Sequence, residues 1–318
     1  MTELNRNGME SNTIFENEID IAEIFWTFWD FKWLIISITS CFAIFSIFYA
    51  LSIPNQYTAS VLLKLSEDSG PSKGQSISNQ VGSLASLAGI SLPSGGGDKS
   101  FYAIETIQSK DFLKHLLEFP FIKENIIAAN GYESNKITYN QEIFDVNNRT
   151  WVREPSNGRL SEPSYVEVHT QLMKKLSISK DKDSMFIRIS FEHFSPVFAY
   201  EFVNLIVQEV NNVARIKDLN ESRLSLEYFN NQIVTTQQKN VKTSINTLIE
   251  GHLKTQMLAN VRTDYLLTPI DSAYVPELKS YPKRSLICIM ITFLGGLLSL
   301  LLVLILHFRK KSKSLLTS

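Results

Sequence analysis

Two long, uncharged apolar runs, one toward each end of the chain, are the strongest feature of its hydrophobic pattern. Residues 285–308 contain no Asp, Glu, Lys or Arg over 24 positions. As a helix this run extends ~36 Å, which exceeds a bilayer hydrocarbon core of about 30 Å. Residues 33–53 are also uncharged and long enough to span. Because a core helix usually keeps a polar face, the pattern predicts transmembrane helices at 33–53 and 285–308.

The residues that flank these runs predict a topology. A basic cluster at 309–313 follows the second run, and such clusters favour the cytoplasmic side. The leader before the first run is long, mainly acidic and lacks a small-residue cleavage site, unlike a signal peptide. We therefore expect a cytoplasmic N-terminal tail at 1–32, a single domain outside the cytoplasm at 54–284 and a cytoplasmic basic tail at 309–318.

Shorter periodic segments predict the elements before residue 195. Apolar positions at helical spacing in 18–32 predict an amphipathic segment on the membrane surface, with a simple extension of the spanning helix as the alternative. Residues 66–100 predict a Ser/Gly-rich loop with a short helical piece, and 139–163 predict no regular element. The remaining segments predict a strand at 57–65, helices at 102–117, 123–130 (closed by Gly131) and 165–176, and a strand pair at 176–179 and 185–192.

The longest helical pattern begins after residue 195. Ser195 is a predicted N-cap and Pro196 suits the first helical position. Apolar side chains then recur in steps of three and four, and no Gly or Pro interrupts 197–250. Taken to Thr235, the helix is ~60 Å long. A domain of this size does not need such a length internally, so we expect the helix to project as an arm.

A polar stretch at 234–246 then suggests an exposed tip, and a four-spaced apolar stripe from Ile245 to Val261 leads back. This pattern predicts a helical hairpin over about 196–262, with an unbroken rod as the alternative, followed by a strand at 265–275. The predicted fold class is therefore α+β: a membrane-proximal α/β base with a long protruding helical hairpin, flanked by two transmembrane helices.

Composition and motifs indicate a protein without an active site of a familiar kind. The formal net charge is −1, which provides no field for nucleic acid, and the only two cysteines, Cys41 and Cys288, lie in the apolar runs. The five histidines have no metal-site spacing. The stretch 95–100 (GGGDKS) resembles a phosphate loop only weakly, because Asp98 separates the glycines from the lysine. We predict no catalytic, cofactor-binding or metal residues, no cofactor, and no enzymatic activity.

Several segments, in this order and between two predicted spans, resemble the Wzz polysaccharide co-polymerases, the bacterial chain length determinant family. They are residues 19–25 (IDIAEIF), 57–63 (YTASVLL), 84–97 (LASLAGISLPSGGG), 257–262 (MLANVR), 269–276 (PIDSAYVP) and 282–284 (PKR). The resemblance covers nearly the whole chain. The residues between Pro276 and Pro282 include fewer prolines than is usual in the family.

The resemblance implies a non-enzymatic regulator in the bacterial inner membrane that sets the modal chain length of O-antigen or a related lipopolysaccharide glycan. It implies a ring-like homo-oligomer, a membrane-embedded polysaccharide polymerase as partner, and contact with membrane lipids. The growing lipid-linked glycan is a further candidate partner. Similar proteins that drive capsule export carry a cytoplasmic kinase, for which residues 309–318 leave no space.

Two groups of residues are candidates for assembly or coupling: Pro276, Pro282, Gly295 and Gly296, and, on the arm, Arg223, Leu226, Phe229 and Ile233. Turn formation and packing alone are the alternative roles for all of them. Two other functions remain open: an adaptor or sensor of an envelope export complex, and a periplasmic enzyme that acts on glycans.

Overall fold

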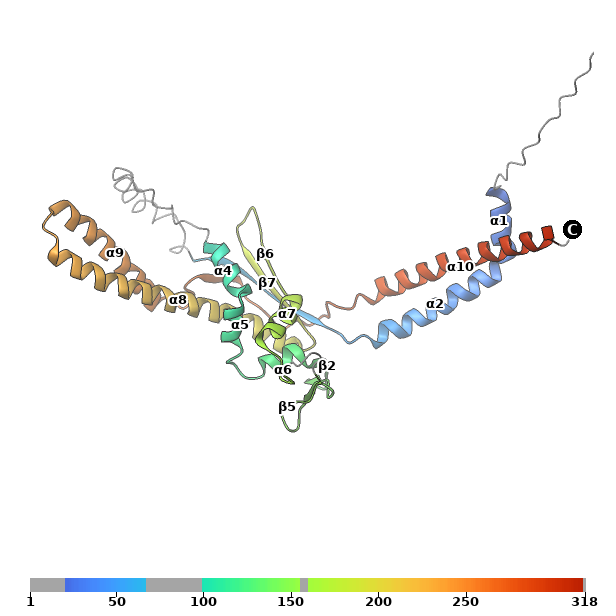
Figure 1. Ribbon diagram of the computed structural model, residues 1–318, viewed down its shortest axis with the longest axis horizontal. Helices are drawn as coiled ribbons and strands as arrows, with labels where there is room; N and C mark the ends of the chain where they lie inside the picture. The colour runs from blue at the N-terminus through green and yellow to red at the C-terminus, as the bar shows by residue number, and fades with distance from the viewer. Residues whose placement is uncertain (1–20, 67–98, 155–159, 317–318) are drawn as a thin grey trace, which may run out of the picture. The chain divides into compact units, whose positions relative to one another are not determined.

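The computed structural model describes residues 21–66, 99–154 and 160–316 (Figure 1). They form a mixed helix and sheet fold with two long apolar helices, as predicted. The chain divides into two compact units, Met1–Ile53 with Lys283–Ser318, and Pro54–Pro282. The helical piece predicted within 66–100 lies outside the described residues.

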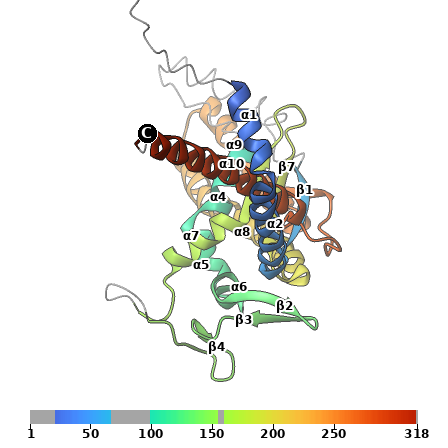
Figure 2. The same ribbon diagram turned by 90° about the vertical axis from the view of Figure 1, so that its right-hand side faces the viewer.

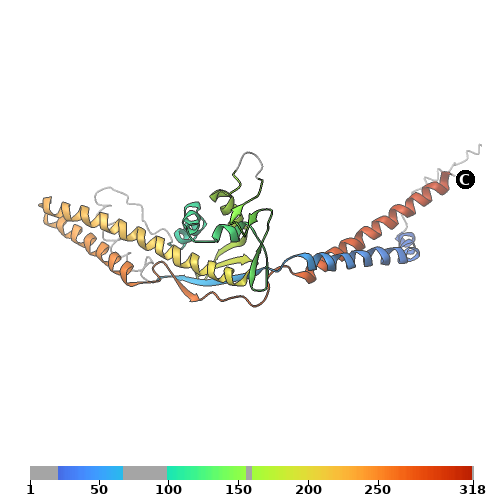
Figure 3. The ribbon, with the colours of Figure 1, turned by 90° about the horizontal axis from the view of Figure 1, so that it is seen from below.

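The described residues of the first unit form three helices: α1 (Ile21–Asp30), α2 (Lys32–Ser52) and α10 (Arg284–Leu316). Phe31 separates α1 from α2, so the alternative of one continuous N-terminal helix is wrong. Helices α2 and α10 pack side by side (Figures 1 and 3). In the most apolar stretch of each helix, few residues are buried: 11% in α2 and 17% in α10. The core helix of a soluble protein, by contrast, is mostly buried. Both helices are therefore long and apolar enough to cross a membrane.

The second unit is built on a four-stranded antiparallel sheet in the order β6-β7-β1-β8. Its strands are β1 (Tyr57–Leu65), β6 (Leu176–Lys180), β7 (Ile187–His193) and β8 (Leu267–Asp271). Strand β1 has the predicted bounds because its apolar and polar residues alternate, and Ala59, Val61 and Leu63 are buried. Strand β8 is shorter than the predicted 265–275.

Two helices replace the single one predicted at 102–117: α4 (Lys99–Gln108) and α5 (Lys110–Leu116). Ser109 separates them because its backbone is extended and its hydroxyl accepts a hydrogen bond from Phe112 N at 3.1 Å, which caps α5. Helix α7 (Tyr165–Lys175) follows the prediction closely, with Ser164 as its N-cap.

The segment between α5 and α7 differs most from the prediction (Figure 2). Helix α6 (Ile122–Ile127) ends before Gly131, which lies in β2 (Ala129–Glu133) and pairs with β3 (Lys136–Tyr139). Gly131 therefore does not close a helix, and a Cβ there would lie 2.7 Å from Thr138 Oγ1 across the hairpin. Residues predicted as irregular include a two-residue ladder, β4 (Phe144–Asp145) with β5 (Thr150–Trp151).

Two long helices complete the unit: α8 (Pro196–Thr235) and α9 (Lys239–Val261). Ser195 Oγ accepts from Phe198 N at 3.2 Å, so α8 begins at the predicted cap, and it ends at the predicted Thr235. The backbone is extended at Thr236 and Gln238, which separates α8 from α9. The two helices pack along each other (Figure 3).

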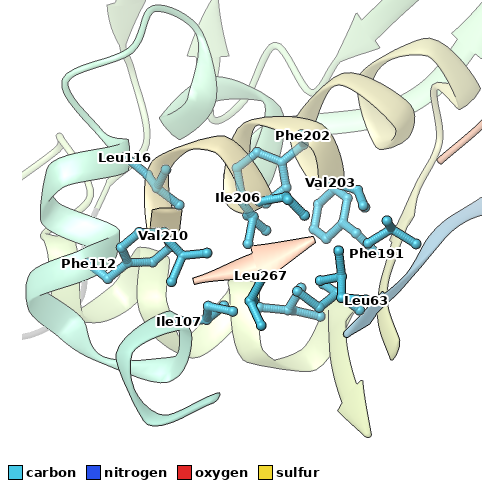
Figure 4. Packing of buried hydrophobic residues seen from close by; sticks show 14 of the residues in the cluster. Leu63, Ile107, Phe112, Leu116, Phe191, Phe202, Val203, Ile206, Val210 and Leu267 are labelled. Atoms are coloured by element: carbon cyan, nitrogen blue, oxygen red, sulfur yellow. The ribbon is translucent and has the colours of Figure 1, made fainter. Parts of the chain in front are cut away.

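The core lies between the sheet and the first half of α8, and α4, α5 and α7 close its sides (Figure 4). Its largest fully buried side chains come from the sheet (Leu63, Ile187, Ile189, Phe191, Leu267), from α8 (Phe202, Ile206) and from the flanking helices (Ile107, Leu113, Leu116, Ile126, Leu172). Each large side chain of this kind stabilises the fold by about 1.5–3 kcal/mol relative to an exposed position. Beyond Ala214 most of α8 is outside this core.

Candidate functional site

Helices α2 and α10 meet along a seam of small side chains. On α10, Gly295, Ser299 and Val303 are buried and lie four residues apart, so they share one face. On α2, Ser46 and Ala50 are buried with the same spacing. Small residues at a helix interface let two backbones approach closely within a membrane. This seam is therefore suited to holding the two apolar helices as one pair.

The two candidate glycines have different roles in this seam. A Cβ on Gly295 would lie 2.5 Å from both Cβ and Cγ of Phe42 on α2, a separation that real Cβ atoms do not show. A Cβ on Gly296 would have Thr39 Oγ1 as its nearest neighbour, at 4.0 Å, which is an ordinary contact. Gly295 is thus the glycine that the close approach requires. The sequence alone gave no indication of Phe42.

The polar groups of the seam are satisfied within their own helices. Ser46 Oγ donates to Ala43 O at 2.7 Å, and Ser299 Oγ donates to Gly296 O at 2.7 Å. A buried hydroxyl without such a bond would be costly in an apolar environment. At the start of α10, Arg284 Nε donates to Ala50 O at 3.1 Å, which joins it to the end of α2.

The candidate prolines belong to the segment that leaves the second unit. Pro276 and Pro282 are both buried, and the Tyr281–Pro282 peptide bond is cis. Gln56 N donates to Tyr281 O at 2.8 Å and Ser280 N donates to Gln56 O at 2.9 Å. The first residues of the unit are thereby hydrogen-bonded to its last residues.

The candidate residues of the arm follow one another at helical spacing on α8 but differ in exposure. Phe229 contacts His252 of α9, with ring centroids 5.8 Å apart, and Leu226 and Ile233 are half-buried. Arg223 is exposed, and its Nη2 donates to Asn220 Oδ1 at 3.5 Å. The apolar stripe predicted for contacts between copies thus includes a residue that already packs within the chain.

Other apolar side chains on these helices are exposed to solvent. On α8, Leu224 is 58% and Tyr228 60% exposed, and they share a face because they are four residues apart. On α9, Leu253, Met257 and Val261 are 46%, 67% and 80% exposed at the same spacing. The hydrophobic pattern alone did not separate these residues from those that face the neighbouring helix.

Polar side chains fix the base of α8 to the strand that follows α9. Asn211, which is buried, accepts from Leu266 N and Leu267 N and donates to Leu267 O. Tyr265 OH donates to Asp218 Oδ2 at 2.6 Å. Burial and the Asp218 carboxylate together raise the pKa of Tyr265, so this hydroxyl stays protonated. These hydrogen bonds fix the position of α8 relative to β8.

His193 is fully buried at the end of β7. Its Nδ1 accepts from Ser195 N at 3.0 Å, and its other nitrogen, Nε2, donates to Asn125 O at 2.9 Å. Burial lowers the pKa of His193 to about 4, so the ring is neutral and links β7, α6 and the start of α8. Among the described residues, no group of three or more His, Cys, Asp or Glu side chains could hold a metal ion.

A family model supplies the comparison that bears on function. Residues 17–118 match the model described as "Wzz: Chain length determinant protein". This match confirms the resemblance to the chain length determinant family that the sequence indicated. Among the curated proteins compared with the chain, none matches.

Solved structures give weaker similarity. A "full-length bacterial polysaccharide co-polymerase" is 11% identical with a TM-score of 0.40, and the alignment covers 92% of this chain and 99% of that one. A fragment of WzzB, a polysaccharide co-polymerase from Salmonella Typhimurium, is 11% identical with a TM-score of 0.28, covering 71% of this chain and 100% of that one. Both TM-scores are below 0.5, so the similarity to these structures is limited.

Proposed function

We propose, on the premise that residues 17–118 place this chain in the chain length determinant family, that it regulates the modal length of a lipopolysaccharide glycan such as O-antigen. It does so without catalysing a reaction, as an oligomeric co-polymerase that acts with a membrane-embedded glycan polymerase. The family match is the single observation that carries this proposal. The two apolar helices and the exposed apolar residues of the arm support it.

We further propose that both apolar helices cross the bacterial inner membrane, with 1–32 and 309–318 in the cytoplasm and the second unit in the periplasm. Large apolar side chains on these helices are exposed, among them Phe45 (61%), Phe48 (70%), Ile289 (68%) and Phe293 (67%). Contact of these apolar side chains with lipid tails is favourable, whereas their exposure to water is unfavourable. The small-residue seam keeps the two spans together as one anchor.

Copies of the chain associate side by side through α8 and α9, which together form a helical arm. The exposed apolar residues Leu224 and Tyr228 on α8 and Met257 and Val261 on α9 support this assembly. Contiguous exposed apolar residues on a soluble surface are typical of a protein contact. A closed ring would cover them on every copy. Pro276 and Pro282 precede the second span and Gly295 and Gly296 lie within it, and in this proposal these four residues couple the assembled copies to the polymerase.

Deletion of the gene tests the proposal. The surface polysaccharide of the deletion strain, separated by gel electrophoresis, should lose its cluster of bands at one length, and the intact gene supplied in trans should restore the cluster. An unchanged ladder in the deletion strain contradicts the proposal. If the chain instead co-purified with an outer-membrane channel and the ladder stayed the same, the export-adaptor alternative would be favoured.

A further inference from the structure

A polar groove runs along α8 beside the segment that joins α9 to β8. Its volume is about 420 Å³, within the range of small-ligand sites. It is lined by Asn204, Val207, Gln208, Glu209, Asn211, Asn212, Arg215, Thr263 and Asp264. All of these except Val207 carry a side chain that forms hydrogen bonds.

The inner wall of the groove is held in place by buried polar residues. Glu209 is only 5% exposed, and its Oε2 lies 2.6 Å from His115 Nε2 on α5. Asn212 Nδ2 donates to the same Glu209 oxygen at 3.3 Å, and Arg215 Nη2 donates to Asn212 Oδ1 at 2.9 Å. Asn211, 4% exposed, is fixed by the backbone of β8. These side chains are therefore ordered before any ligand arrives, which lowers the entropic cost of binding.

The charges of the groove do not favour a strongly charged ligand. Two carboxylates, Glu209 and Asp264, lie with one guanidinium, that of Arg215, and the other polar lining groups are amides and a hydroxyl. Because Glu209 is already partnered by His115, Asp264 and Arg215 are the charged lining groups that remain, so neither an anion nor a cation meets an excess of opposite charge. A ligand that is neutral and offers many donors and acceptors fits this mixture best.

Saccharides have this chemistry, because every sugar hydroxyl can both donate and accept a hydrogen bond. Amide, carboxylate and guanidinium groups each present two polar atoms in one plane, so each can bind two neighbouring hydroxyls at once. We propose that this groove binds a neutral saccharide segment, with Gln208, Thr263 and Asp264 at its exposed rim. The proposal rests on the proposed function, since it assigns the periplasmic unit a contact with the glycan whose length is regulated.

Calorimetric titration of the full chain in detergent tests this site. The probe is the neutral oligosaccharide fraction released by mild acid from the surface polysaccharide of the same cells. A double variant, Gln208→Ala with Thr263→Ala, removes two rim hydrogen-bonding groups and leaves the buried wall intact. Each side chain contributes about one net hydrogen bond, so the loss of two should weaken binding roughly thirtyfold. The matched control is Gln171→Ala, an exposed glutamine on α7 outside the groove, which should bind like the wild type.

Three results would overturn the proposal. The first is equal affinity of the wild type and the double variant, and the second is no heat of binding with millimolar neutral oligosaccharide. The third is preferential binding of inorganic phosphate or of an acidic oligosaccharide. These outcomes are separable from the deletion experiment, because a strain that loses its modal length on deletion of the gene would keep the proposed function even if this groove bound nothing.

Discussion

Asn211 on α8 hydrogen-bonds both backbone groups of Leu267 on β8. Its Oδ1 accepts from Leu267 N at 2.8 Å, and its Nδ2 donates to Leu267 O at 2.9 Å. Oδ1 also accepts from Leu266 N at 2.7 Å. Strand β8 lies at the edge of the sheet. One side chain on α8 thus binds the backbone groups that a further strand would otherwise bind.

The first prediction concerns this contact. Asn211→Ala would leave the buried backbone groups of Leu266 and Leu267 without these bonds, and each unsatisfied group costs about 1–3 kcal/mol. The free energy of unfolding of the full chain in detergent, measured by denaturant titration, should therefore fall by roughly 3 kcal/mol. Asn230→Ala, at an exposed position on the same helix, should change it by less than about 0.5 kcal/mol. Equal effects of the two variants would refute the role given to Asn211.

A second prediction separates the adjacent glycines of α10. Gly295→Ala would force α2 and α10 apart, because its Cβ would overlap Phe42, and overpacking of this kind costs about 1–3 kcal/mol. Gly296→Ala has room and serves as the matched control. Thermal melting of the detergent-solubilised chain should show a lower Tm for Gly295→Ala alone. A similar loss in both variants would mean that the seam does not depend on this approach.

His193 predicts a specific dependence of stability on pH. In the unfolded chain a histidine titrates near pH 6.5, whereas burial lowers the pKa of His193 to about 4 in the fold. Above pH 6.5 the ring is neutral in both states, so its contribution is complete. Between pH 6.5 and 4 only the unfolded chain takes up the proton, so stability falls as the pH falls, by at most about 3 kcal/mol.

Melting of the wild-type chain and of His193→Gln between pH 7 and 4.5 measures this effect. The wild type should lose more of its Tm across this interval than the variant does. The difference between the two curves isolates His193 from the carboxylates that titrate at lower pH. Parallel curves for the two proteins would show that His193 is not buried in its neutral form.

The last prediction concerns the contacts between copies. Leu224→Glu combined with Tyr228→Glu would place two charges on the exposed apolar face of α8, where burial against another copy would be costly. Multi-angle light scattering of the detergent-solubilised chain should then report smaller particles. Asn230→Glu, an exposed position on α8 that does not share a face with Leu224 and Tyr228, is the control and should keep the wild-type mass. Unchanged mass in the double variant would rule out this face as the contact.

The sequence predicted correctly those helix and strand ends that depend on residues within or next to the element. The bounds of β1 follow from its alternation, and the start of α8 follows from Ser195 and Pro196. Ser109 was a similar signal that could have predicted the break between α4 and α5, since serine is a favoured N-cap.

Features decided by distant contacts could not be read from the sequence. The short β4–β5 ladder depends on packing of the Phe144 and Trp151 rings, whose centroids are 5.0 Å apart. Gly131 is typical of a helix end, but cross-strand pairing with Thr138 places it in a hairpin instead. The polar groove could likewise not be predicted from the sequence, because its lining combines residues of α8 with residues about 50 positions later.

Electron microscopy of the full chain extracted in detergent would show whether copies anchored by two apolar helices associate side by side through the α8–α9 arm. We expect closed rings of identical copies, each with a helical arm that meets its neighbours along Leu224 and Tyr228. Single copies that stay apart at the concentrations used for imaging, or a chain that remains soluble without detergent, would contradict it.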